Sequence, residues 1–176
     1  ADVINISFGG AYCNPTDPIS EALKEAMDRG IIVVASAGNC GASCNDIAAC
    51  NGFVGVTTPG CTPEVITVGS VGAQNNASCF SSGQPLEGYG IKPDLVAPGE
   101  NITSSTVGGG YAASKGTSMS AAFVSGAAAL LLEMNPNLSQ QEVKGLLELT
   151  AKDLGEAGKD ISYGSGVVQL SRLPLN

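Results

Sequence analysis

The chain has 176 residues, of which 43% are apolar and 14% charged, which argues for a folded domain and against a disordered or fibrous chain. Eight basic and sixteen acidic residues give a net charge of -8, which repels phosphate backbones and anionic surfaces, so we expect no nucleic acid partner. The longest apolar stretch, residues 121–132, is interrupted by Ser125 and Gly126 and is shorter than the roughly 18 residues that a membrane span needs, so we expect no membrane partner.

The first half of the chain predicts a strand, a helix and a second strand. Residues 3–8 form a β-branched run that begins directly after Ala1 and Asp2, with no Met and no signal peptide, so we expect a preceding segment to be missing. Asp17 and Pro18 are typical of a helix start. A doubly apolar run follows at residues 31–35, which predicts a βαβ unit and therefore a parallel sheet covered on both faces.

The second half of the chain predicts two more strands and two helices. The strands are expected at residues 64–68 and 95–96. One helix is expected at residues 118–134, and a second begins at the capping box formed by Ser139 and Glu142. The order of these elements indicates one α/β domain, or part of one.

Six cysteines, at positions 13, 40, 44, 50, 61 and 79, lie in the first half of the sequence. Their even number and loop-like surroundings favour disulfides and an oxidising compartment, although the sequence leaves the pairing open. Four of them fall within residues 40–61, so we expect at least one bridge inside that loop. A zinc site is the alternative, but the cysteine spacing, with no histidine, fits no usual zinc finger or ribbon.

The helix at residues 118–134 begins with a serine and consists largely of small residues, which is typical of a helix packed tightly in a core. Backbone N–H groups and the positive end of the helix dipole lie beside the side chain of a serine in such a position, and they stabilise negative charge there. The alternative is that Thr117 or Ser118 is simply the helix N-cap.

Several segments together resemble the subtilisin-like serine proteases, the subtilases. Residues 116–120, Gly-Thr-Ser-Met-Ser, and the small-residue helix after them are similar to the nucleophile segment of that family. Residues 33–39, Val-Val-Ala-Ser-Ala-Gly-Asn, resemble the strand that ends in its oxyanion-hole Asn, and residues 2–10 resemble its substrate-pairing strand. Further similar segments follow in the family's order, at residues 59–69, 80–82, 92–99 and 163–168.

The resemblance implies a three-layer α/β/α fold with a mainly parallel sheet, of which residues 1–176 would be an incomplete, C-terminal portion of a single catalytic domain. It makes Ser118 the nucleophile that becomes the acyl-enzyme, and Asn39 a side-chain donor to the oxyanion. The alternative role for Asn39 is that of a turn residue in the left-handed conformation. The implied substrate-binding residues are Ser7, Phe8 and Gly9, whose backbone would pair with a peptide, and Ser36, Ala37 and Gly38, which would form one wall of a side-chain pocket.

The chain departs from the family pattern at several positions. The catalytic Asp and His of subtilases precede the nucleophile, and neither has a counterpart here. The sequence contains no histidine, and none of Asp2, Asp17, Asp28 and Asp46 lies in a matching motif. Ala122 and Phe123 stand where the family usually has Pro and His, although that His is not the catalytic one. Thr57 lies near the position where the family often has a Gly at the base of the pocket. No metal ligand or cofactor is assigned; calcium is an expectation from the family, whose sites draw largely on the region not present here.

The sequence therefore predicts part of a secreted, extracellular serine endopeptidase that acts on polypeptides. Its partner would be the N-terminal segment of the same protease, carrying Asp and His, and this chain alone is expected to be inactive. We expect that segment to supply strands beside residues 3–8 and 31–35. One alternative is a non-catalytic subtilase-like scaffold or binding module, and another is a nicked enzyme whose two chains stay associated.

Overall fold

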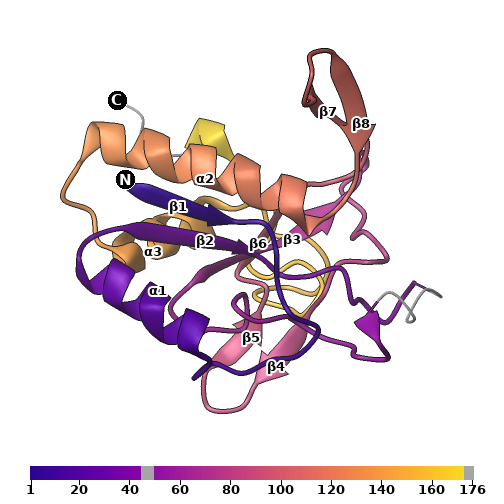
Figure 1. The fold of residues 1–176 in the computed structure, drawn as a ribbon, viewed down its shortest axis with the longest axis horizontal. Coiled ribbons are helices and arrows are strands. Elements are labelled where there is room, and N and C mark those ends of the chain that lie inside the picture. Colours follow the sequence, from indigo (N-terminus) through magenta and orange to yellow (C-terminus); the bar gives the residue numbers. More distant parts are fainter. Residues whose placement is uncertain (45–49, 173–176) are drawn as a thin grey trace.

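The computed structural model describes residues 1–44 and 50–172, and its centre is a parallel sheet of four strands in the order β1-β2-β3-β6 (Figure 1). The strands are β1 (Val3–Ile6), β2 (Ile32–Ser36), β3 (Ile66–Val71) and β6 (Leu95–Pro98). All four predicted strands are confirmed, with ends shifted by a few residues. Register is continuous across the sheet: Val3 lies opposite Ile32, and Val68 lies opposite Leu95.

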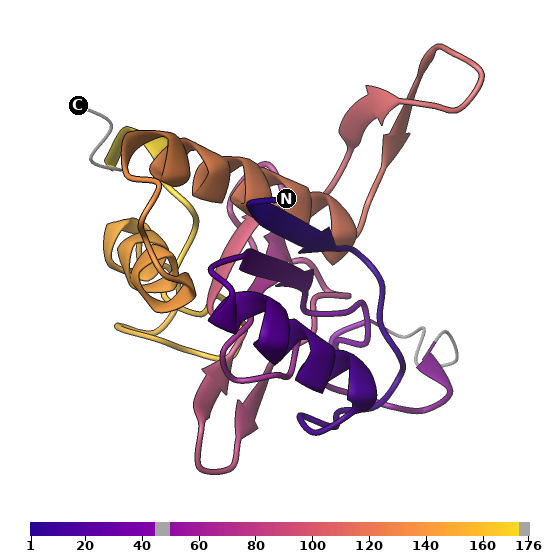
Figure 2. The ribbon, with the colours of Figure 1, turned by 60° about the vertical axis from the view of Figure 1, so that its left-hand side comes forward.

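Helices cover both faces of this sheet. The α1 helix (Pro18–Asp28) lies on one face, and α2 (Thr117–Met134) and α3 (Gln140–Thr150) lie on the other (Figures 1 and 2). A hydrophobic core lies on each face of the sheet, and successive residues of β2 point into opposite cores. Val33 packs with residues of α1, and Val34 packs with residues of α2 and α3. The predicted three-layer α/β/α fold is confirmed.

Capping residues place the helix ends where the sequence predicts them. The Asp17 side chain accepts a hydrogen bond from the Ile19 backbone N–H at the start of α1. Ser139 and Glu142 form the reciprocal capping box of α3. These contacts are local in sequence, which is why the sequence reveals them.

The α2 helix has 18 residues, and by length and composition alone it is long and apolar enough to cross a membrane. The expectation from sequence that no segment is long and apolar enough was wrong. The mean hydropathy of the 18 residues of α2 stays high despite the serine, threonine and glycine residues among them. One side of α2 packs on the sheet through small and branched side chains. Its buried residues are Thr117, Ser120, Ala121, Val124, Ala127, Ala128 and Leu131.

Two short hairpins and one 3-10 turn were not predicted. The hairpins pair β4 (Gln84–Leu86) with β5 (Gly90–Lys92) and β7 (Ile102–Ser105) with β8 (Tyr111–Ser114), and the turn is η2 (Leu170–Arg172). The β7–β8 hairpin projects from the body of the protein (Figures 1 and 2). Its strands are largely exposed on both faces, so they carry no apolar alternation that the sequence could reveal.

All six cysteines form disulfides, in the pairs Cys13–Cys61, Cys40–Cys50 and Cys44–Cys79. The expected bridge within residues 40–61 is confirmed as Cys40–Cys50, and the zinc alternative was wrong. Residues 45–49 of the same loop lie outside the described part of the chain. The bridge begins at the residue directly after Asn39, so it ties the loop to the end of β2.

Within the described sheet, β1 has one unpaired edge, whereas β2 pairs on both sides, with β1 and β3. The expectation that a missing strand also lies beside residues 31–35 was therefore wrong, because β1 and β3 occupy both positions. At the opposite end of the sheet, Val167 forms a parallel bridge to Val96 of β6. A further strand could therefore join the sheet beside β1, at the edge opposite to β6.

Candidate active site

Ser118 is the second residue of α2, the helix that packs on the sheet. The N-cap of this helix is Gly116, and its φ of 146° favours glycine. No side chain caps the helix at this residue. The alternative that Thr117 or Ser118 is the N-cap was therefore wrong. The Ser118 hydroxyl donates to the backbone carbonyl oxygen of Ser7 at 3.0 Å, and the Ser7 hydroxyl donates to the backbone carbonyl oxygen of Ser118 at 2.9 Å.

Asn39 follows β2 and is held by the first turn of α2. Its Oδ1 accepts from the backbone N–H and from the hydroxyl of Thr117, both at 3.0 Å. Since the oxygen side of the amide is engaged, its NH₂ side is the one that faces away from Thr117. A Cβ atom at Gly116 would lie 3.3 Å from Asn39 Nδ2, so the glycine leaves room beside this group.

The positive φ at the end of β2 belongs to Gly38, at 104°, and not to Asn39. The alternative of a left-handed turn residue at Asn39 was therefore wrong. The Gly38 backbone N–H donates to the Thr117 hydroxyl at 3.2 Å, which in turn donates to Asn39. Thr117 thus aligns the amide of Asn39. Sequence reasoning missed this role because it depends on a contact between residues far apart in the chain.

Ser118 and Asn39 line one cavity of about 300 Å³. Its other lining residues are Ser7, Phe8, Gly9, Ala11, Ser36, Gly38, Cys40, Cys50, Thr57 and Thr117. All the predicted site residues except Ala37 are therefore brought together here. Ala37 is fully buried in a core cluster with Val56 and Cys61, because successive side chains of an extended segment point in opposite directions.

Among residues 1–44 and 50–172, the lining of this cavity contains no ionisable side chain, and the sequence contains no histidine. The acceptor of the Ser118 hydroxyl is a backbone carbonyl, which cannot act as a general base at neutral pH. The site therefore combines a serine at the positive end of a helix with an amide donor, and none of its described lining residues could remove the serine proton.

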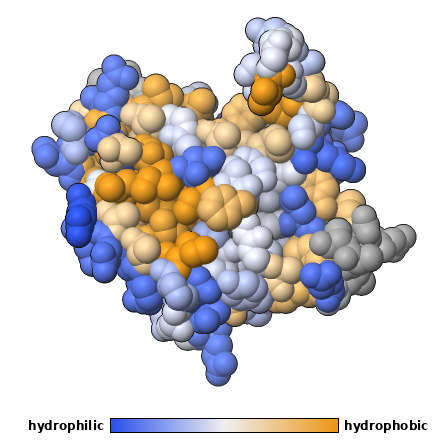
Figure 3. Space-filling view, viewed as in Figure 1, coloured by the Kyte–Doolittle hydropathy of each residue, from blue (hydrophilic) through white to orange (hydrophobic). Residues whose placement is uncertain are grey.

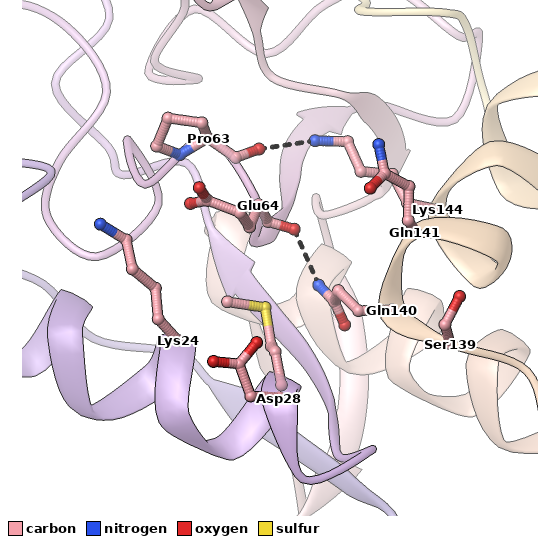
Figure 4. Close-up of a pocket in the computed structure, with 9 residues that line it drawn as sticks. Lys24, Asp28, Pro63, Glu64, Ser139, Gln140, Gln141 and Lys144 are labelled. Atoms are coloured by element: carbon pink, nitrogen blue, oxygen red, sulfur yellow. Dashed lines mark hydrogen bonds between the residues drawn. The ribbon is translucent and has the colours of Figure 1, made fainter.

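A larger cavity, of about 660 Å³, lies between α1 and α3 (Figure 4). Lys144 Nζ donates to the Pro63 carbonyl at 2.8 Å, and Gln140 Nε2 donates to the Glu64 carbonyl at 2.9 Å. These side chains join α3 to the segment before β3. Among its described lining residues, the one hydroxyl is that of Ser139, which is engaged in the capping box of α3.

Asp94 is a buried carboxylate held by three ammonium groups. Lys92 Nζ lies 2.7 Å from Asp94 Oδ2, and Lys159 and Lys144 lie 2.9 and 3.0 Å from Oδ1. Burial raises the pKa of Asp94, but the three ammonium groups together outweigh it and bring the pKa well below its ordinary value. Burial also lowers the pKa of Lys92 to about 7, because the attraction of Asp94 only partly offsets the desolvation.

Replacing Asp94 by asparagine should destabilise the folded protein by about 3–5 kcal/mol at pH 7, because it removes the counter-charge of the buried Lys92 and of the partly exposed Lys144 and Lys159. The pKa of Asp94 is lower in the folded than in the unfolded chain, so its stabilising contribution is complete above about pH 4 and is lost as the pH falls below that. The difference between D94N and the unmodified protein should therefore shrink in acid.

Urea unfolding of the complete protein, including the upstream segment that the resemblance implies, would measure this difference. E87Q, at an exposed carboxylate, is the matched control and should change the free energy of unfolding by less than about 0.5 kcal/mol. Equal stability of D94N and the unmodified protein at pH 7 would show that the cluster contributes no net stability.

The described acidic side chains form no cluster for a calcium ion. In the described ranges, no group of three or more His, Cys, Asp or Glu residues is placed to hold a metal. The oxygens around Asp94 already surround a cation, since the Lys92 ammonium also donates to Val65 O at 2.7 Å and to Thr67 Oγ1 at 2.9 Å. We derive no role for calcium from this chain.

The fold is a three-layer parallel α/β fold. A serine at the start of the central helix and an amide after the end of a strand line one cavity, as the resemblance to the subtilases implies. Residues 1–166 match the Subtilase family, and the chain belongs to that family. It is 36% identical over 166 residues to Subtilisin BL of Lederbergia lenta, covering 94% of this chain and 54% of that protein.

Other relatives agree with this assignment. The chain is 35% identical over 166 residues to an alkaline protease of Alkalihalobacillus alcalophilus, covering 94% of this chain and 38% of that protein. It is 39% identical over 173 residues to Subtilisin E of Bacillus subtilis (strain 168), covering 96% of this chain and 40% of that protein. The chain thus spans about half the length, or less, of these relatives.

Proposed function

We propose that residues 1–176 are the C-terminal portion of the single catalytic domain of a subtilisin-like serine endopeptidase, which hydrolyses polypeptides through an acyl-enzyme on Ser118. The observation that carries this proposal is that the Ser118 hydroxyl and the Asn39 amide, from distant parts of the chain, line one cavity. Membership of the Subtilase family and the relative named as an alkaline protease support it.

In this mechanism, Ser118 Oγ attacks the carbonyl carbon of the scissile peptide bond while a base from outside this chain removes the hydroxyl proton. The carbonyl oxygen becomes an oxyanion, to which the Asn39 side chain and the backbone N–H of Ser118 donate. The backbone of Ser7, Phe8 and Gly9 pairs with the peptide as an added strand. The amine leaves with a proton, and water then hydrolyses the ester on Ser118.

The proposed partner is the upstream segment of the same protease, which would carry the catalytic Asp and His. Two observations favour a segment that packs on the outer side of β1 and α2. The edge of β1 is unpaired within the described sheet, and apolar surface gathers over β1 and the adjoining part of α2 (Figure 3). Val3 and Ile4 are half-buried there, and Phe123 and Leu130 on α2 are exposed. We call the upstream segment and this chain together the parent protease.

The proposed location is extracellular. Three disulfides in a chain of 176 residues are typical of a protein that folds in an oxidising compartment. Calcium, which the family resemblance implies, would draw its side-chain ligands largely from the upstream segment, since the described acidic side chains of this chain form no cluster for a metal.

A second candidate is a subtilase-like scaffold that binds peptides without cleaving them, and the lack of histidine in this chain favours it. A fluorophosphonate probe separates the two functions, because it reacts with a serine that a neighbouring base has activated. The parent protease should be labelled at Ser118, found by peptide mapping, and S118A should lose both labelling and hydrolysis. S120A, at a buried serine on the same helix, is the control and should keep both. A parent protein that is folded but not labelled would favour the scaffold.

A further inference from the structure

The backbone on both sides of Asn39 is held by one residue from another part of the chain, Ser82. The Ser82 backbone N–H donates to Gly38 O at 3.0 Å, and the Cys40 backbone N–H donates to Ser82 Oγ at 2.9 Å. Ser82 is 1% exposed and Cys40 is 7% exposed, so the hydrogen bond between them is shielded from water, which strengthens it. A single residue thus fixes the positions directly before and after the amide.

Pairing between β2 and β3 stops before it reaches Asn39. Among the described residues, it ends at the hydrogen bond from the Ala37 backbone N–H to Val68 O, at 2.9 Å. Beyond that point the neighbouring segment is residues 80–82, which also accept a hydrogen bond from the Gly41 backbone N–H, at 2.9 Å. This segment therefore takes over from β3 in holding the chain around the amide.

Segment 80–82 is itself anchored to β3. Its Ser81 hydroxyl accepts from the Ser70 backbone N–H at 2.9 Å, and the Ser78 backbone N–H donates to Ser70 O, also at 2.9 Å. A further hydrogen bond of 2.9 Å, from the Ser81 backbone N–H to Ser78 O, closes the turn between them. Hydrogen bonds thus run from the central sheet through this segment to Asn39.

From this geometry we propose that Ser82 is a positioning residue for peptide hydrolysis and that it acts through Asn39. This inference rests on the proposed endopeptidase function and adds a residue to its oxyanion machinery. Thr117 orients the amide of Asn39 from the side of α2, whereas Ser82 fixes the backbone from which that side chain extends. Ser82 is not among the described residues that line the Ser118 cavity, so we assign it no contact with the substrate.

The expected effect of Ser82 follows from the short range of a hydrogen bond. A donor stabilises an oxyanion at about 2.7–3.1 Å, and a misplacement of about 1 Å can cost about 100-fold in rate. Without the Ser82 hydroxyl, the buried Cys40 N–H loses its acceptor, and the backbone after Asn39 can shift.

The test compares S82A with the unmodified parent protease on one fluorogenic peptide. S82A should lower kcat about 10-fold and leave KM within about 2-fold, because the displaced donor serves the transition state and not the bound substrate. S20A is the matched control, since it removes a fully buried serine hydroxyl on α1 that accepts from Thr62 Oγ1 at 2.8 Å. It should leave both constants unchanged, and urea unfolding would show that each variant is folded.

A double-mutant cycle distinguishes a positioning residue from a merely structural one. Once Asn39 is alanine there is no amide to position, so adding S82A to N39A should lower kcat by less than about 2-fold. A general loss of structure would instead lower kcat by the same factor in both backgrounds. If S82A does not fold, S82C takes its place, and because a thiol is a weaker acceptor it should act in the same direction by a smaller factor.

Two results would overturn the inference: an unchanged kcat in folded S82A, or an equal loss of kcat from S82A with and without the Asn39 amide. Failure of the proposed function gives a different outcome, because then the unmodified parent protein cleaves no peptide and the fluorophosphonate probe does not label Ser118.

Discussion

Residues 1–176 alone should show no detectable peptide hydrolysis, whereas addition of the upstream segment should raise activity by at least about 10³-fold. The Ser118 hydroxyl donates to a backbone carbonyl and has no base beside it in the described part of the chain, so its unperturbed oxygen is too weak a nucleophile to attack an amide. In subtilisin, loss of the catalytic His costs about 2 × 10⁶ in kcat, and the remaining oxyanion machinery retains only about 10³–10⁴ over water.

The experiment measures fluorophosphonate labelling and peptide hydrolysis for the chain alone, for the chain with the upstream segment, and for S118A with that segment. Cooperative unfolding should also appear only when the segment is present, because it would cover the free edge of β1 and the apolar side of α2. Labelling of the isolated chain as fast as the parent protease would refute the claim that the base lies upstream.

In the parent protease, replacing Asn39 by alanine should lower kcat about 100- to 1000-fold and leave KM nearly unchanged. The negative charge that Asn39 stabilises exists in the transition state and not in the bound substrate, so its loss affects the chemical step alone. The size of the effect is that of a comparable donor in subtilisin.

Steady-state kinetics on a peptide substrate would measure both constants. N137A replaces an exposed asparagine between α2 and α3 and is the matched control, for which neither constant should change. If N39A left kcat unchanged while the protein remained folded, Asn39 would serve only to hold the end of β2 against α2 through its contacts with Thr117.

Local signals in the sequence were sufficient for the fold class. The apolar runs of β2 and β3, the cap at Asp17 and the capping box at Ser139 involve neighbouring residues, and each was predicted close to its observed position. The segment containing Ser118 could be recognised for the same reason. The β7–β8 hairpin was missed because both its faces are largely exposed, and without a buried face a strand has no apolar alternation.

The sequence by itself also determined that residues 1–176 contain no histidine to activate Ser118, since composition does not depend on folding. Only the tertiary structure decided which cysteines pair, that Thr117 aligns Asn39, and that Ser82 holds the backbone on both sides of Asn39. It also showed that β2 is paired on both edges and that Ala37 lies outside the cavity. The physical reason is the same in each case: these features depend on distances between residues far apart in the chain, which are set when the sheet and α2 pack together.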